Sequence, residues 1–133
     1  MSPTRSCLLV DDDAGIRELI ALNLAAEGMD VHVLSDGAGV EAMAESLHPD
    51  VVLLDVMMPG RDGYEVLAGL KASDATRDIP VVLLSAKASD TEVWQGWQAG
   101  ADYYLTKPFN IDELIHYLDL ILSGGDDAES PED

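Results

Sequence analysis

The sequence predicts an α/β fold in which a parallel sheet is covered by helices on both faces. Short apolar runs alternate along the 133 residues with longer segments whose apolar positions recur every three or four residues, the period of a helix. Strands that alternate with helices over short connections pair in parallel through right-handed crossovers. The length suits one domain with its own hydrophobic core.

Five strand-like runs are present, and three of them are apolar throughout. A strand covered on both faces is continuously apolar, whereas polar residues suit the edges of a sheet. The order 2-1-3-4-5 places the two runs with polar residues at the edges, and this is the flavodoxin-like doubly wound arrangement of five βα units. The runs are CLLV (7–10), VHVL (31–34), VVLL (51–54), VVLL (81–84) and YYL (103–105).

Each run is followed by a helical pattern with an apolar stripe that we expect to face the sheet. Asp13 is the expected N-cap of the first helix, and Asn110, with Glu113 three residues on, that of the last. In the fourth helix we expect Trp97 in the core and Trp94 partly exposed. The stripes are Ile16, Leu19, Ile20 and Asn23 or Leu24; Val40, Met43, Ala44 and Leu47; Val66, Leu67 and Leu70; Val93, Trp94 and Trp97; and Ile111, Leu114, Ile115, Leu118 and Ile121 or Leu122.

The last residues form a separate segment. Beyond Leu122 the chain reads SGGDDAESPED, with no apolar residue larger than Ala. Such a segment cannot bury enough apolar surface to offset the entropy lost on ordering. We therefore expect one domain over residues 5–122 and a flexible acidic tail, or the stub of a linker, over residues 123–133.

The composition excludes several classes of protein. Against 26 acidic residues stand only 7 basic ones, a formal net charge of −19, so no basic patch is available for direct contact with nucleic acid. No apolar run approaches the roughly 20 residues of a membrane span, and no signal peptide opens the chain, so we expect a cytoplasmic protein. Cys7 is the single cysteine, which excludes a disulfide framework within the chain.

Polar and charged residues stand where the strands end. In an open α/β sheet the ligand site lies beyond the carboxyl ends of the strands, here between strands 1 and 3. We expect these residues to meet at one rim, although each on its own could be an ordinary loop residue. They are Asp11 and Asp12 after strand 1, Asp55 after strand 3, Ser85 after strand 4, and Lys107, followed by Pro108, after strand 5.

Three carboxylates at one rim predict a bound cation. Asp11, Asp12 and Asp55 would repel one another and raise their pKa values unless a cation joined them. Mg²⁺ fits, because it takes one or two carboxylates, keeps several waters and completes its shell with phosphate, whereas a calcium cage needs more protein oxygens. Lys107 would add a fixed positive charge, and the Ser85 hydroxyl could donate to a phosphate.

Four motifs in order, LLVDDD, LLDVMMPGRDG, LLSAK and GADYYLTKPF, resemble the receiver domain of two-component response regulators. The resemblance covers residues 5–122. It implies that Asp55 accepts a phosphoryl group, and that Pro59, Asp62 and Gly63 form the loop after the acceptor. It further implies that Mg²⁺ is held by Asp11, Asp12, Asp55 and the backbone carbonyl of Met57, that Lys107 and Ser85 contact the phosphoryl group, and that Ser85 and Tyr104 form the switch.

The resemblance also implies a signalling function. The donor would be a phosphohistidine of a sensor histidine kinase or histidine phosphotransfer protein, and the chain would catalyse only its own phosphorylation and slow dephosphorylation. The surface of the fourth helix, fifth strand and fifth helix would then change and control a downstream protein or effector domain, with the chain a monomer or a phosphorylation-dependent dimer. Met57 and Lys87 occupy positions that affect the attacking water, and because Met cannot orient water, we expect a long-lived phosphoryl group.

Other classes stay open. The chain could be a receiver cut from a longer regulator that carried an effector domain. A flavin-binding protein shares the fold, but no phosphate-binding loop rich in Gly, Ser and Thr follows strand 1. An Asp-nucleophile phosphatase of the haloacid dehalogenase type would carry a second Asp where Met57 stands. His32, His48 and His116 lack metal-ligand spacing, and we expect them to be structural or on the surface.

Overall fold

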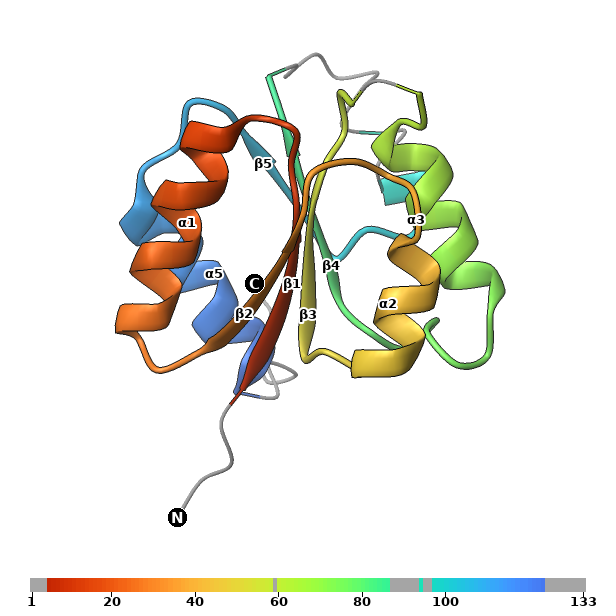
Figure 1. The fold of residues 1–133 in the computed structure, drawn as a ribbon, viewed down its shortest axis with the longest axis horizontal. Coiled ribbons are helices and arrows are strands. Elements are labelled where there is room, and N and C mark those ends of the chain that lie inside the picture. Colours follow the sequence, from red (N-terminus) through yellow and green to blue (C-terminus); the bar gives the residue numbers. More distant parts are fainter. Residues whose placement is uncertain (1–4, 59, 87–93, 95–96, 124–133) are drawn as a thin grey trace.

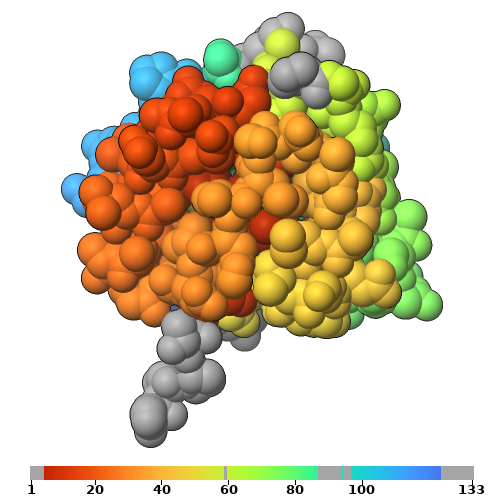
Figure 2. Space-filling model, in the orientation of Figure 1, coloured from red at the N-terminus to blue at the C-terminus, as the bar shows by residue number. Residues whose placement is uncertain are grey.

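The computed structural model describes residues 5–58, 60–86, 94 and 97–123 and has three layers. A five-stranded parallel sheet in the order β2-β1-β3-β4-β5 forms the middle layer, which confirms the predicted fold and strand order. Helices α1 and α5 cover one face of the sheet, and α2 and α3 cover the other (Figure 1). In the space-filling view from the same side, α1, β2 and α2 hide β1 almost entirely (Figure 2).

The strands grade from buried to half-exposed as their sequences predict. The central strands β3 and β4 are buried at every position, and β1 is buried from Cys7 onward, whereas the edge strands β2 and β5 are largely half-exposed. Burial raises the pKa of the Cys7 thiol to about 12, so this side chain stays protonated in the core. The bounds are β1 Ser6–Val10, β2 Asp30–Leu34, β3 Val51–Asp55, β4 Val81–Ser85 and β5 Tyr103–Thr106.

Two cores result from the alternation of side chains along each strand. One lies between the sheet and α2 and α3, where Val66, Leu67 and Leu70 are fully buried. The other lies under α1 and α5, where Ile20 and Leu114 are fully buried. The helices are α1 Ala14–Ala26, α2 Val40–Leu47, α3 Gly63–Ala72 and α5 Ile111–Leu122.

Local signals at the helix ends agree with the predictions. Asp13 caps α1 by accepting from the amide of Ile16 at 3.1 Å. Asn110 caps α5, accepting from the amide of Asp112 at 3.0 Å. No helix within the described ranges is long and apolar enough to cross a membrane. Most of the expected fourth helix, including Val93, and the expected tail from residue 124 onward lie outside the described residues.

Two predictions of burial are wrong. Leu19 was expected on the buried stripe of α1 but is 49% exposed, because the buried face is the narrow line of Ile20 and Leu24 and the residue before Ile20 points about 100° away from it. Trp97 was expected in the core but is 46% exposed. Ala99, in the turn that follows, packs against the core instead. Trp94 is 63% exposed.

Candidate functional site

Backbone hydrogen bonds continue the sheet past the strand ends and fix the floor of the site. The Asp11 amide donates to the Leu34 carbonyl at 3.2 Å. The Val56 amide donates to Leu84 at 2.9 Å, and the Lys107 amide donates to the carbonyl of Ser85 at 2.6 Å. The first residues after β1, β3 and β5, which are Asp11, Val56 and Lys107, are therefore held by hydrogen bonds to neighbouring strands.

Three carboxylates meet at this carboxyl edge, as the sequence predicts. Asp11, Asp12 and Asp55 each offer one oxygen, and these oxygens lie within 4.8 Å of one another. Asp11 is fully buried and Asp55 is 3% exposed, whereas Asp12 is exposed. Among the described residues this is the one group of acidic, His or Cys side chains close enough to share a metal ion.

Lys107 lies among the buried carboxylates. Its Nζ is 2.9 Å from Oδ2 of Asp11 and 3.4 Å from Oδ1 of Asp55. Burial disfavours the charged ammonium, but the hydrogen bond to Asp11 and the negative charges of both acids outweigh this and raise the pKa of Lys107. The Lys107–Pro108 peptide bond is cis. The ammonium is therefore a permanent positive charge inside the site.

A single ammonium does not neutralise the cluster. Burial, followed by repulsion from Asp11, raises the pKa of the Asp55 carboxyl from 3.8 to about 7, although Lys107 acts in the opposite direction. Oxygen ligands at this spacing, one of them exposed to solvent, fit a hard divalent cation such as Mg²⁺ that keeps part of its water shell. Binding such a cation would relieve the repulsion that raises the pKa of Asp55.

Ser85 ends β4 and Tyr104 lies in β5, the two strands beyond β3 in the sheet. Ser85 is fully buried and pairs in register with Thr106 across β4 and β5. Tyr104 precedes Thr106 by two residues and so shares its face, packed against the core of α2 and α3. The structure thus places the predicted switch pair on neighbouring strands.

The loop after Asp55 is closed by a hydrogen bond from the Gly63 amide to the Val56 carbonyl at 2.9 Å. A Cβ on Gly63 would lie 2.5 Å from the Asp55 carbonyl oxygen and 2.7 Å from Cα of Val56, so only glycine allows α3 to begin this close to β3. Asp62 caps α3 in a reciprocal capping box with Glu65. The Met57 amide donates to Oδ1 of Asp55 at 3.2 Å.

Some predicted residues lie elsewhere or outside the described residues. Pro59 and Lys87 are outside them. The three histidines serve local structure or the surface: His32 contacts Asp30 at 3.2 Å, His48 ends α2, and His116 lies beside Tyr117 on α5.

Sequence reasoning missed Arg17, whose Nη1 donates to the backbone carbonyl of Asp11 at 2.8 Å. The signal was available, because Arg17 falls one turn into the helix that Asp13 caps.

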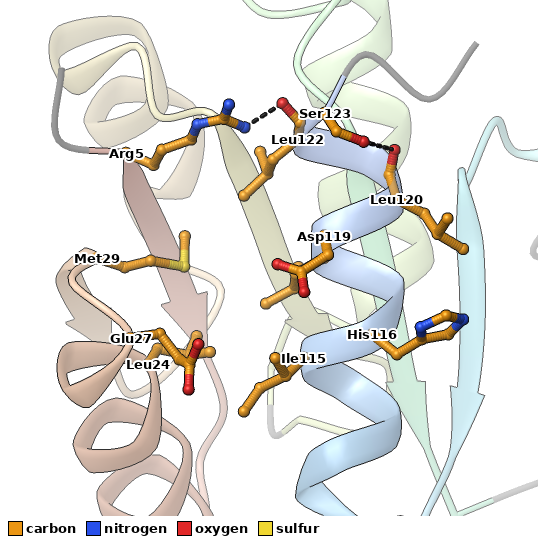
Figure 3. Close-up of a pocket in the computed structure, with 11 residues that line it drawn as sticks. Arg5, Leu24, Glu27, Met29, Ile115, His116, Asp119, Leu120, Leu122 and Ser123 are labelled. Carbon is orange, nitrogen blue, oxygen red and sulfur yellow. Dashed lines mark hydrogen bonds between the residues drawn. The ribbon is translucent and has the colours of Figure 1, made fainter. Parts of the chain in front are cut away.

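A cavity of about 470 Å³ lies far from the carboxylates, between the end of α1 and α5 (Figure 3). Leu24, Met29 and Ile115 line it, with Glu27 and Asp119 among its polar residues. Arg5 donates to the carbonyl of Leu122 at its border. Its charged side chains are not among the described groups whose ligand atoms lie close enough to share a metal ion, so the acidic cluster is the better candidate for chemistry.

Comparisons with known proteins agree with this geometry. A protein-family model described as the response regulator receiver domain matches residues 7–119 of the sequence. The DNA-binding dual master transcriptional regulator RpaA of Synechocystis sp. is 42% identical over 108 residues, 81% of this chain and 45% of RpaA. The phosphate regulon transcriptional regulatory protein PhoB of Pseudomonas aeruginosa is 39% identical over 129 residues, 96% of this chain and 56% of PhoB. The chain thus spans about half the length of these curated relatives.

Solved structures show the same likeness over nearly their whole length. The receiver domain of a Francisella response regulator superimposes with a TM-score of 0.85 at 34% identity, covering 92% of this chain and 99% of that one. The receiver domain of a sensor histidine kinase from P. aeruginosa, described with a magnesium ion coordinated in its active site cleft, gives a TM-score of 0.83 at 30% identity, covering 91% and 99%.

Proposed function

The chain belongs to the response regulator receiver domain family of two-component systems, and we propose that it is a signalling switch that accepts a phosphoryl group on Asp55. The observation that carries the proposal is the buried carboxylate of Asp55, set between a second buried carboxylate, Asp11, and the ammonium of Lys107. A nucleophile for phosphoryl transfer needs position and surrounding positive charge more than intrinsic reactivity.

In the proposed step, an oxygen of Asp55 attacks the phosphorus of a phosphohistidine on a sensor kinase or histidine phosphotransfer protein. The new P–O bond forms as the P–N bond breaks, and the imidazole leaves and takes up a proton. The product is an aspartyl phosphate. The backbone of Asp55 is fixed in β3, so little motion separates the resting side chain from the attacking one.

Asp11, Asp12, Asp55 and the carbonyl of Met57 would hold Mg²⁺, which supplies positive charge to the oxygens of the transferring phosphoryl group. Lys107 supplies a second positive charge, because its Nζ already lies 3.4 Å from Oδ1 of Asp55. Its ammonium also favours the ionised, nucleophilic form of Asp55.

The signal would leave through Ser85 and Tyr104. The Ser85 hydroxyl, at the buried end of β4, would donate to the phosphoryl group, and Tyr104 would turn inward along the same face. The surface of the fourth helix, β5 and α5 would change as a result. A shift from 1:99 to 99:1 requires about 5.5 kcal/mol of differential stabilisation, a size that several charge-assisted hydrogen bonds approach.

Partners follow from this output surface. RpaA and PhoB are transcriptional regulators about twice as long as this chain. We therefore propose that the chain is either a single-domain regulator or the receiver of a longer one. Residues 5–122 would form the domain and residues 123–133 a tail or linker. It would act in the cytoplasm, as a monomer or as a dimer formed on phosphorylation. The net charge of −19 argues against direct DNA contact by these residues.

The lifetime of the phosphoryl group should be long. Met57 is 52% exposed beside Asp55 and offers no side-chain group that could orient a water by hydrogen bonding. Decay of the purified phosphorylated protein would measure this, and a half-life of seconds would contradict it.

Transfer of a labelled phosphoryl group from candidate histidine kinases to the native protein and to an Asp55→Ala variant, each with and without Mg²⁺, tests the proposal that Asp55 is the acceptor. We expect labelling of the native protein only with Mg²⁺, and none of the variant. Asp50→Ala is a matched control, because Asp50 precedes the same strand at its other end and accepts from the Ser6 amide. Labelling of Asp55→Ala equal to native would place the acceptor elsewhere, and turnover of free phosphate esters would favour a phosphatase.

A further inference from the structure

Arg61, in the loop after Asp55, is bonded to helix α2, which covers the same face of the sheet as α3. Its guanidinium donates to both carboxylate oxygens of Glu41 in the first turn of α2, with Nη1 at 2.7 Å from Oε1 and Nη2 at 2.5 Å from Oε2. Nη1 also donates to the Gly37 carbonyl at 3.2 Å, and Nη2 to that of Glu65 at 3.3 Å. One side chain thus joins residues 37–41 at the start of α2 to residues 61–65 at the start of α3.

Two glycines leave room for this pair. A Cβ on Gly69 in α3 would overlap the carboxylate of Glu41. A Cβ on Gly37 would lie 2.9 Å from Cβ of Arg61 and 3.2 Å from its carbonyl oxygen. Neither glycine has the positive φ that would explain it by backbone conformation. The space between α2 and α3 is therefore shaped around the ion pair.

The pair is more than a loose surface contact. Both side chains are about one-third exposed, and the fork-to-fork geometry between guanidinium and carboxylate is the most directional that an ion pair adopts. The hydrogen bond with Arg61 lowers the pKa of Glu41, so the pair stays ionised through neutral pH.

The position of Arg61 connects it to the candidate site. The loop from Val56 to Gly63 is closed at its base by the hydrogen bond between these two residues, and Met58 anchors one arm in the core. Arg61 anchors the other arm. Met57, whose amide donates to Oδ1 of Asp55 and whose carbonyl is a proposed metal ligand, lies between Val56 and Met58 in this loop.

We propose that Arg61 and Glu41 form a positioning pair that holds this loop in the conformation that binds Mg²⁺, and so set the affinity of the site for the ion. The inference rests on the proposed function, because it assigns the Met57 carbonyl as a ligand. Neither residue touches the reacting atoms. Their effect is to keep a carbonyl on a closed loop from moving away from the carboxylates.

Calorimetric titration of Mg²⁺ into the unphosphorylated protein tests the pair. Arg61→Met and Glu41→Gln should each raise the dissociation constant about three- to tenfold, at or below the lower bound of the roughly 10- to 100-fold loss seen for groups that orient a ligand directly, because the pair acts through the loop. The double variant should be no weaker than the single ones, because both break the same contact. Arg61→Lys should recover part of the affinity, since Lys keeps the charge but not the fork.

Arg77→Met is the matched control, because Arg77 pairs with the exposed Asp74 away from the loop. It should leave the dissociation constant at the native value, and urea unfolding of all variants would show that each is folded during the titration. Native affinity in both Arg61→Met and Glu41→Gln, with Mg²⁺ still bound by the native protein, would overturn the positioning pair alone. Failure of the native protein itself to bind Mg²⁺ would overturn the proposed function and with it the pair.

Discussion

Acidic side chains at the two edges of the sheet both accept hydrogen bonds from backbone amides, but they differ in burial and in their charged neighbours. At the amino edge, Asp50 accepts from the amide of Ser6 and Asp102 from that of Val81, both at 2.8 Å, and both acids are exposed. At the carboxyl edge, Asp11 and Asp55 are buried, and their mutual repulsion contributes to the raised pKa of Asp55.

The difference separates acids that stabilise the fold from acids that require a ligand. A carboxylate that accepts from backbone amides at a solvated strand end is satisfied within the protein. The two buried carboxylates Asp11 and Asp55 also accept from backbone amides, but they repel one another across a single ammonium, and a cation that binds there relieves this repulsion. We therefore expect the chemistry of the protein at the carboxyl edge, where buried carboxylates repel one another.

Replacing the lysine at each edge should give the largest difference in the rate of phosphorylation. Lys107→Met leaves two buried carboxylates without their ammonium, so the rate of phosphorylation by acetyl phosphate with Mg²⁺ should fall by about 100-fold. Lys71→Met at the amino edge removes donors to the carbonyls of Arg77 and Ile79 and should leave that rate within about twofold of native. Mass spectrometry of the intact proteins over time measures both, and equal rates would remove Lys107 from the site.

The pH dependence of stability should come from the carboxyl edge. Because the folded-state pKa of Asp55 is raised from 3.8 to about 7, its contribution to stability is fully present below pH ~4 and is lost as the pH rises through about 7. At 1.36 kcal/mol per pKa unit, the loss without Mg²⁺ is on the order of 4 kcal/mol.

Urea unfolding at pH 5 and pH 8 in the absence of Mg²⁺ measures this slope. Asp55→Asn should flatten it and should be more stable than native at pH 8, whereas Asp50→Asn should keep the native slope. Adding Mg²⁺ at pH 8 should restore stability to the native protein and not to Asp55→Asn. A native slope in Asp55→Asn would show that other groups carry the pH dependence.

Replacing a glycine at each edge should give a smaller difference, measured as the loss of unfolding free energy. Gly63→Ala places a Cβ against the backbone of Asp55 and Val56 and should cost about 1–3 kcal/mol of unfolding free energy, with slower phosphorylation. Gly28→Ala, at a positive φ of 89° with open space around it, should cost about 1 kcal/mol and leave phosphorylation unchanged. Urea midpoints and the phosphorylation assay measure both effects, and a smaller cost at Gly63 would contradict the close approach of α3 to β3.

The strand order and the gathering of Asp11, Asp55 and Lys107 could be predicted because each depends on strong, local signals. Continuous apolar runs identify central strands, and parallel strands bring their ends to one edge. The cap at Asp13 likewise depends on its immediate neighbours alone.

What could not be predicted depends on packing between distant segments. The positions of Leu19 and Trp97 follow from how each helix is rotated against the sheet, and periodicity leaves that rotation uncertain by one position. The pairing of Arg61 with Glu41 joins residues 20 apart and needs the space left by Gly37 and Gly69, so in sequence both resemble ordinary surface charges.

Reduction of the phosphorylated native protein with borohydride, followed by peptide mass spectrometry, identifies the acceptor residue, because borohydride converts an aspartyl phosphate to homoserine. We expect homoserine in place of Asp55, and only after incubation with both the phosphoryl donor and Mg²⁺. Homoserine in place of Asp11 or Asp12, or equal conversion without Mg²⁺, would contradict this expectation.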